Sequence, residues 1–248
     1  MAPTIFAPQD YIMRKFIVAA VAVCASLSAF SQATKPTLIN RAGDHFMLQL
    51  GSSKWTNVPD SIDSHLKGFN RSANVYLMLD KPFKGNPHFS AAIGVGVGTS
   101  NIYFKKMLVD ISSNKALLPF IKADSINHYK KYKLATAYLD IPFELRFTSD
   151  PENSKKGIKA ALGVKVGTML NAHTKGRTLQ NASNNNLNSA TDKVSSKTYF
   201  NTTRLAATAR VGYGLFSLYG TYNFTSVFKD GVAPDMKMFQ VGLTISGL

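Results

Sequence analysis

Residues 132–147 read Tyr-Lys-Leu-Ala-Thr-Ala-Tyr-Leu-Asp-Ile-Pro-Phe-Glu-Leu-Arg-Phe, and this stretch decides the fold. From Leu139 to Phe147 every odd position is apolar. The even positions between them are Asp140, Pro142, Glu144 and Arg146. A period of two predicts a β-strand with two different faces. Because the charged face cannot lie in a dry core without partners, the pattern favours a closed barrel in a bacterial outer membrane, apolar outside and polar inside.

Seven further segments alternate in the same way. The eight predicted strands cover residues 45–50, 72–79, 89–103, 132–147, 157–170, 204–213, 215–224 and 238–246. Most approach the roughly 9 to 11 residues that cross a bilayer at a tilt. In residues 93–98 aliphatic residues alternate with glycine, which indicates a crowded interior. The predicted fold class is all-β: an eight-stranded antiparallel up-and-down transmembrane β-barrel, with ten strands as the alternative count.

The connections between these segments alternate between long and short. The long ones are residues 51–71, 104–131, 171–203 and 225–237, and the short ones are 80–88, 148–156 and 213–214. Outer-membrane barrels have short periplasmic turns and long extracellular loops. Residues 180–189 are low in complexity, so we expect no fixed conformation there. A soluble eight-stranded calyx would also alternate but would bury its apolar face inside; the loop asymmetry favours the membrane barrel.

The N-terminal residues have the pattern of an export signal. Arg14 and Lys15 precede the apolar run 16–27, and small residues follow that suit cleavage after Ser31. We therefore expect a signal peptide within residues 1–31, with Met13 as the true start, and a barrel domain over residues 32–248. The only cysteine, Cys24, lies in this signal, and lipidation there is the minor alternative because no small residue precedes it.

The chain is strongly basic, with 29 Lys and Arg against 14 Asp and Glu and a formal net charge of +15. The basic residues are scattered, without a recognition helix or a basic run, which argues against a nucleic-acid partner. A positive rim suits the phosphate-rich head groups of outer-membrane lipid, and an ordinary solvated surface is the equal alternative. Mean hydropathy near zero excludes a bundle of transmembrane helices.

Five aromatic residues fall where membrane interfaces are expected. Phe89, Phe147 and Phe216 would point outward at the short-turn ends, and Tyr103 and Phe224 near the long-loop ends. Tyrosine and other aromatic side chains favour the level of the lipid head groups, so these residues predict two girdles. The rim of a soluble core is the other interpretation of the same residues.

Seven charged residues are predicted to point into the barrel. They are Asp140, Glu144, Arg146, Lys159, Lys165, Arg204 and Arg210. Pairing across the 148–156 turn would place Asp140 opposite Lys165, or Glu144 opposite Lys159, depending on the register, and diagonal contacts remain within reach. We expect a paired network that fills the lumen, because eight strands enclose just enough room for side chains. A proton or ion path, or a plug that rearranges, is the functional alternative.

The segment Tyr138-Leu-Asp-Ile-Pro-Phe-Glu-Leu145 resembles the Tyr-Leu-Glu-Ile-Pro-Leu segment of the PorT-like outer-membrane barrels of Bacteroidetes. Residues 213–222 and 241–243 are similar to the last hairpin of that family, and Asp140 departs from its more usual glutamate. The resemblance implies an outer-membrane β-barrel and a loose link to protein secretion.

The sequence shows no catalytic, cofactor-binding or metal-binding motif. The histidines are His45, His65, His88, His128 and His173, and all but the inward-facing His45 are interpreted as solvated residues of loops and turns. We therefore expect a non-enzymatic barrel of the bacterial outer membrane that acts through its extracellular loops as a binding or structural/assembly protein. Its long loops would contact a protein or glycan partner, notably through the apolar residues 116–121. A small outer-membrane enzyme or a narrow transporter, with its site at the loop end, is the alternative.

Overall fold

The computed structural model describes residues 45–123, 127–153 and 156–247. The predicted signal peptide, its cleavage site and the start of the barrel domain lie outside these residues. Within the described residues no helix is long and apolar enough to cross a membrane.

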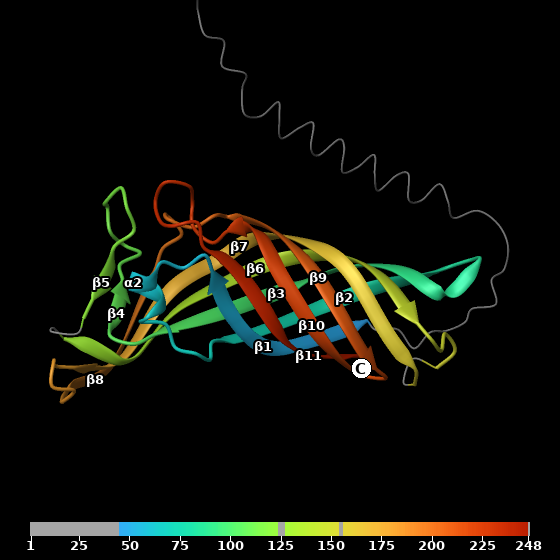
Figure 1. Ribbon diagram of the computed structural model, residues 1–248, viewed down its shortest axis with the longest axis horizontal. Coiled ribbons are helices and arrows are strands. Elements are labelled where there is room, and N and C mark those ends of the chain that lie inside the picture. Colours follow the sequence, from blue (N-terminus) through green and yellow to red (C-terminus); the bar gives the residue numbers. More distant parts are fainter. Residues whose placement is uncertain (1–44, 124–126, 154–155, 248) are drawn as a thin grey trace, which may run out of the picture. The chain divides into compact units, whose positions relative to one another are not determined.

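Eight antiparallel strands close into a barrel (Figure 1). They are β1 (Phe46–Thr56), β2 (Arg71–Phe83), β3 (Asn86–Phe104), β6 (His128–Thr148), β7 (Ile158–Gln180), β9 (Thr203–Tyr213), β10 (Phe216–Ser226) and β11 (Lys237–Ser246). Pairing runs from β6 through β3, β2, β1, β11, β10 and β9 to β7, and β7 returns to β6. The predicted eight-stranded barrel is confirmed.

Four smaller elements gather at one end of the barrel, opposite the β2–β3 turn (Figure 1). They are α2 (Asp60–Asp63), β4 (Met107–Val109), β5 (Phe120–Lys122) and β8 (Asn186–Ser195). The prediction of a loop over residues 171–203 is wrong for much of its length, because β7 continues to Gln180 and β8 pairs with it. β8 has no alternation of burial, since its residues are all exposed, so its sequence carries no period-two signal.

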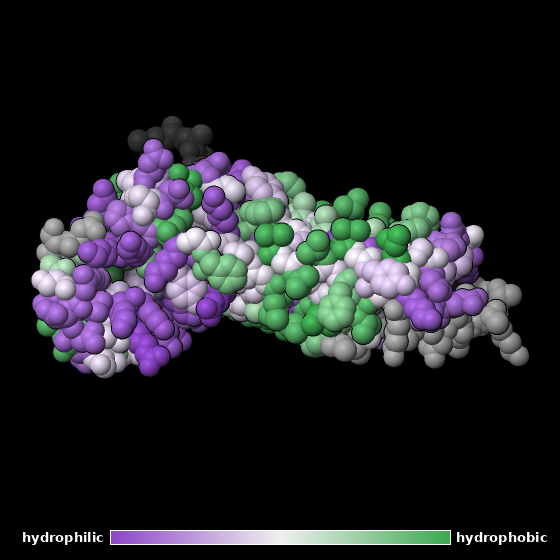
Figure 2. Space-filling view, turned by 60° about the horizontal axis from the view of Figure 1, so that its bottom comes forward, coloured by the Kyte–Doolittle hydropathy of each residue, from purple (hydrophilic) through white to green (hydrophobic). Residues whose placement is uncertain are grey.

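An apolar belt surrounds the middle of the barrel. Figure 2 shows it on the visible face as a hydrophobic band between hydrophilic surfaces. Its exposed residues include Leu50, Val75, Leu77, Leu79, Ile93, Val95, Val97, Leu139, Ile141, Phe143, Leu145, Leu162, Val164, Val166, Leu205, Val211, Leu218, Phe239, Val241 and Leu243. The alternate residues of the same strands are buried inside and mostly polar. This is the arrangement of a barrel whose outer surface contacts lipid.

The belt ends before the strands do. On β3 the outward residues after Val97 are Thr99, Asn101 and Tyr103, and on β6 the outward position opposite Tyr103 is Lys133. β6 has 21 residues and β7 has 23, about twice the number that crosses a bilayer. We call the region with the belt the membrane part, and the region beyond it the loop-end part.

The loop-end part has an apolar core inside the barrel wall. Trp55 packs edge-on against Phe104 and Phe228, with ring centroids 5.8 and 5.6 Å apart, and Phe200 packs against Phe228 at 5.1 Å. Around them lie further buried residues, among them Ile62, Ile102, Met107, Val109, Ile111, Leu118, Tyr199, Val227 and Met236. The interior therefore changes from polar to apolar at the level where the exterior changes from apolar to polar.

Three connections are tied together across this core. The backbone N–H of Leu118 donates to the carbonyl of Val232 at 2.8 Å. The hydroxyl of Tyr199 donates to the carbonyls of Ser113 and Lys115, both at 2.7 Å. These bonds join the β4–β5, β8–β9 and β10–β11 connections, so the loops close over the barrel mouth.

Four of the five predicted interface aromatics lie at the two edges of the apolar belt, and the fifth, Tyr103, lies beyond it. Phe89 and Phe147 pack together at 5.2 Å near the short-turn end, where Phe216 is also exposed. Phe224 lies at the other edge of the belt. Tyr103 lies six residues beyond Val97, in the loop-end part beside Lys133, because β3 continues past the membrane part.

A charge in the middle of the belt tests where lipid contacts the barrel. Val164→Arg should lower the free energy of unfolding in phosphatidylcholine vesicles by about 2–4 kcal/mol, the cost of arginine near the bilayer midplane. The matched change Ala190→Arg, on the exposed β8, should alter it by less than about 0.5 kcal/mol. Equal losses in urea titrations of the two variants would contradict the assignment of the belt.

Candidate functional site

The seven charged residues singled out in the sequence all lie inside the membrane part, buried by the surrounding strands. They are Asp140, Glu144 and Arg146 on β6, Lys159 and Lys165 on β7, and Arg204 and Arg210 on β9. Each strand places them there by the same alternation that turns its aliphatic residues outward. They form two clusters at successive depths.

The first cluster is built on Asp140, which is fully buried. Arg204 donates from Nε to Oδ1 of Asp140 at 2.8 Å and from Nη2 to Oδ2, a bidentate pair. The hydroxyl of Tyr76 donates to the same carboxylate at 3.0 Å, and Lys165 Nζ donates to Tyr76 at 3.3 Å. The guanidinium of Arg204 also lies 4.2 Å from the ring centre of Tyr138. The carboxylate thus has three donors, which compensates for the loss of water.

Two glycines make room for this pair. A Cβ at Gly98 would lie 2.6 Å from Nη2 of Arg204 and 2.8 Å from Oδ2 of Asp140. A Cβ at Gly167, on the opposite neighbour of β6, would collide with the other carboxylate oxygen. The ion pair therefore fills space that only glycine leaves open, which agrees with the crowded interior expected from the sequence.

The second cluster is built on Glu144. Its Oε2 accepts from Arg146 Nε at 2.8 Å and from Arg210 Nη2 at 3.0 Å. Arg146 also approaches Asp80 on β2, with 3.9 Å between Nη1 and Oδ1. Sequence reasoning missed Asp80 because it was assigned to a turn. The signal was present, since Asp80 continues the inward parity of Ser72, Asn74, Tyr76 and Met78.

Neither predicted pairing between β6 and β7 occurs. Lys165 lies opposite Pro142, and Lys159 lies opposite Thr148. Asp140 and Glu144 instead face Gly167 and Gly163 across the ladder, and reach over these glycines to the arginines of β9. Asp140 and Glu144 thus bond to arginines of β9 instead of lysines of the adjacent β7, because the glycines leave no side chain between the acids and these arginines.

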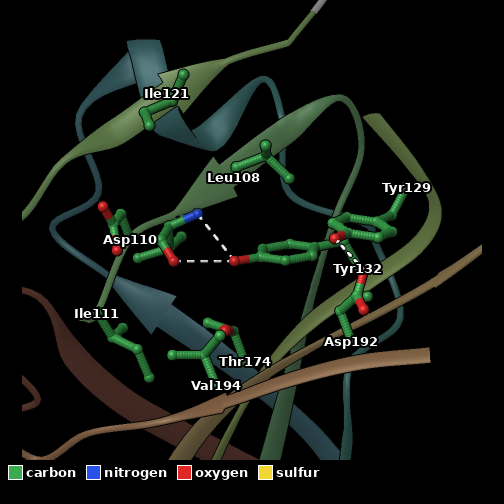
Figure 3. Close-up of a pocket in the computed structure, with 11 residues that line it drawn as sticks. Leu108, Asp110, Ile111, Ile121, Tyr129, Tyr132, Thr174, Asp192 and Val194 are labelled. Carbon is green, nitrogen blue, oxygen red and sulfur yellow. Dashed lines mark hydrogen bonds between the residues drawn. The ribbon is translucent and has the colours of Figure 1, made fainter. Parts of the chain in front are cut away.

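A pocket of about 250 Å³ opens in the loop-end part (Figure 3). It is lined by Leu108, Val109, Asp110, Ile111, Ile121, Tyr129, Tyr132, Thr174, Gly176, Asp192 and Val194. These residues come from β4 and the connection that follows it, β5, the start of β6, the end of β7 and β8. The pocket is therefore built by the elements that the strands add beyond the membrane.

Two stacked tyrosines shape one side of the pocket. The rings of Tyr129 and Tyr132 are 5.8 Å apart and nearly parallel. Tyr132 is fixed by β4, because its hydroxyl donates to the carbonyl of Val109 at 2.9 Å and accepts from the N–H of Val109 at 3.1 Å. Tyr129 donates to Asp192 at 2.6 Å (Figure 3). Gly176 lies beneath the ring of Tyr129, where a Cβ would be 2.6 Å from the ring.

The pocket combines aliphatic walls with two carboxylates. Leu108, Ile111 and Ile121 supply the apolar surface, and Asp110 and Asp192 supply the negative charge. Such a site suits a small molecule with an apolar body and a hydrogen-bond-donating or cationic end. The sequence did not single out this pocket, because its lining comes from five elements and only the fold brings them together.

The histidines are more ordered than the sequence suggested. His128 is buried at the start of β6, with Nε2 3.2 Å from Oδ1 of Asn184, and His173 lies half-buried within β7. His88 belongs to β3, and its Nδ1 donates to the carbonyl of Thr148 at 2.9 Å. The interpretation of these three as solvated residues of loops and turns is wrong, because β3, β6 and β7 are longer than predicted. His45 contacts the carbonyl of Met78 at 3.1 Å, and His65 follows α2 in a loop.

Across the part of the chain that the structure describes, no three His, Cys, Asp or Glu residues are grouped as a metal site would require. The acids of the lumen already bond to arginine, and those of the pocket to a tyrosine and to Ser112.

The family model of the outer membrane protein beta-barrel domain matches residues 30–229. The chain belongs to this family. No curated protein matches it significantly. Membership agrees with the closed barrel and its apolar belt, and it implies location in the bacterial outer membrane. In barrels of this membrane the long loops face outward, so the pocket of this outer-membrane barrel lies on its extracellular side.

Breaking the buried ion pair tests its role in the lumen. Arg204→Met should lower the free energy of unfolding by about 3–5 kcal/mol, because Asp140 is then buried without its partner. The double variant Asp140→Asn with Arg204→Met should lose less than the sum of the single variants, as measured in a denaturant cycle in detergent micelles. Lys84→Met, at an exposed position of the β2–β3 turn, is the control; additive losses would contradict the pairing.

Proposed function

We propose that this outer-membrane barrel is a non-enzymatic binding protein whose extracellular pocket takes a small amphipathic ligand. The observation that carries the proposal is the pocket itself, a cavity with aliphatic walls, two stacked tyrosines and two carboxylates, one of which accepts a hydrogen bond from Tyr129. It lies on the side of the membrane that a ligand from outside reaches first. The pocket is formed by elements that a barrel does not need in order to cross the membrane.

The filled lumen supports binding rather than conduction. In the membrane part Tyr76, Tyr219, Met47 and Met78 are fully buried beside the two ion-pair clusters. In the loop-end part the aromatic core around Trp55 stands beneath the tied connections. An ion that crossed the barrel would have to pass the ion-pair clusters and then the aromatic core, and the side chains of both would have to move aside. We therefore favour the structural role of the charged network over a proton or ion path.

The apolar residues 116–121 support a pocket rather than an exposed recognition loop. Leu118 is buried in the core, and Ile121 lines the pocket from β5. Leu117 remains largely exposed. Residues 116–121 thus close the barrel mouth and form one wall of the pocket. A protein or glycan partner would contact only Leu117 of this segment, together with the outer surface of the loops.

The environment of the histidines supports a non-enzymatic role. His45 and His88 bond to backbone carbonyls, and His128 bonds to the amide of Asn184. His65 Nδ1 lies 3.1 Å from the hydroxyl of its exposed neighbour Ser64, but the same nitrogen lies 3.2 Å from the carbonyl of Ser61, to which it can only donate. A nitrogen that donates in this way cannot take the proton of Ser64, as hydrolysis by a base-activated nucleophile would need. As part of the same proposal, the chain is a PorT-like barrel of Bacteroidetes with a link to secretion, and the resemblance of residues 138–145 supports this.

Conductance tests whether the lumen is closed. The protein inserted in a planar bilayer should give no discrete current steps, because buried side chains fill both parts of the barrel. A porin measured in the same bilayer serves as the positive control. Steps that persist in Asp140→Asn, and grow with salt like those of the porin, would instead support the narrow transporter.

Ligand screening tests the pocket. Fragments that carry a primary amine on an aliphatic or aromatic body should bind the detergent-solubilised protein, as measured by ligand-observed NMR. Val194→Trp, at the exposed rim, should weaken this binding at least about tenfold by filling the entrance. Leu187→Trp, also exposed on β8 but outside the lining, should leave the binding unchanged. Binding that neither variant alters would refute the pocket as the site.

A further inference from the structure

A row of basic residues crosses the outer face of the loop-end part. In the strand register Lys133 of β6 lies directly opposite Lys175 of β7, which lies directly opposite Lys193 of β8. One step further out, Lys131 lies opposite Arg177. We call these five residues the basic face. All point away from the barrel axis, and all but the half-buried Lys133 are exposed.

Like charges at directly opposed positions destabilise a sheet. Burial, and after it the charges of Lys175 and Arg71, lower the pKa of Lys133 below its usual value. Lys133 has neutral partners, Oδ1 of Asn101 at 2.6 Å and the ring of Tyr103, whose centroid lies 5.9 Å away. Asp192, the acid next to Lys193, bonds instead to Tyr129 at the pocket. A fold that holds three lysines in register therefore calls for an anion outside the protein.

The distance of the basic face from the apolar belt indicates which anion its lysines can reach. On β7 the apolar belt ends at Leu170, and Lys175 follows five residues later. Five residues span about 17 Å along a strand, or about 13 Å along the membrane normal at a tilt of about 40°. The head-group layer occupies roughly the first 5–8 Å beyond the hydrocarbon. Because lysine side chains bend toward a membrane surface, their ammonium groups reach the outer part of this layer.

We propose that the basic face binds the phosphate groups of a glycolipid in the outer leaflet. The lysine row of β6, β7 and β8 provides the charge, and the belt beneath it receives the acyl chains of the same lipid. This site lies on the outer surface of the β7–β8 hairpin, and it is distinct from the pocket on the inner surface. The two proposals can therefore fail separately.

The test compares Lys175→Gln with Lys193→Gln, made together, against a control pair at the short-turn end. The control is Lys84→Gln with Lys156→Gln, which removes the same charge from exposed lysines. Each protein is placed in phosphatidylcholine nanodiscs that contain a minor fraction of bisphosphorylated lipid A, and retained lipid A is counted by native mass spectrometry. The first pair should retain roughly thirtyfold less lipid A than the wild type, the scale set by about 1 kcal/mol for each of two cations at an anionic surface. The control pair should match the wild type.

Thermal unfolding supplies a second readout, because only a bound phosphate would make the sign of the effect differ between detergent and lipid A. In an uncharged detergent, Lys175→Gln with Lys193→Gln should raise the unfolding temperature, because it removes repulsion from Lys133. In nanodiscs with lipid A the same variant should lower it, since the bound phosphate is lost. Equal retention of dephosphorylated and bisphosphorylated lipid A would overturn the proposal. Displacement of lipid A by excess inorganic phosphate would show a site for free anions and would overturn it too.

Discussion

The structure depends on closure of the backbone hydrogen-bond ladder by β6 and β7. In hydrocarbon an unpaired N–H or C=O finds no water, so a sheet can cross the membrane only without edges. β6 and β7 share a register that runs, with one shift, from His128 opposite Gln180 to Thr148 opposite Lys159. Once this ladder is closed, each strand has one face toward lipid and one toward the lumen. The positions of the belt, the ion pairs and the glycines all follow from that constraint.

Along a single long strand, the kind of residue that is buried changes between the membrane part and the loop-end part. On β6 the inward residues of the membrane part are charged, like Asp140 and Glu144, whereas those of the loop-end part are apolar, like Leu134. The outward residues change in the reverse sense, from Leu139 to Lys133. The reason is the solvent, since lipid accepts only apolar side chains outside while water allows an ordinary hydrophobic core inside. The loop-end part is thus built like a small soluble domain on a membrane barrel.

This change along the strands explains which features the sequence could predict. Strict alternation located the eight barrel strands and the inward parity of the seven charged residues, because this signal is local. It ended at Leu170, where the register between β6 and β7 shifts by one residue. Before this bulge the even residues of β7 point outward, and beyond it His173, Lys175 and Arg177 do. A period-two pattern cannot continue across such a shift. The partners of Asp140 and Glu144 were missed for a different reason, since they depend on glycines in the strand between.

The distribution of constraints indicates where this barrel can carry a site. In the membrane part each residue is fixed from two directions, because lipid determines the outward residues and the paired charges determine the inward ones. A substitution on either face lowers the stability of the barrel, so few positions in the membrane part can change to bind a ligand. The loop-end part has neither restriction, and its strands gain new edges to which β8 can add and new rims on which β4 and β5 can pack. A pocket on its inner surface and a basic face on its outer surface can therefore coexist within one hairpin, each changed without disturbing the ladder that holds the barrel closed.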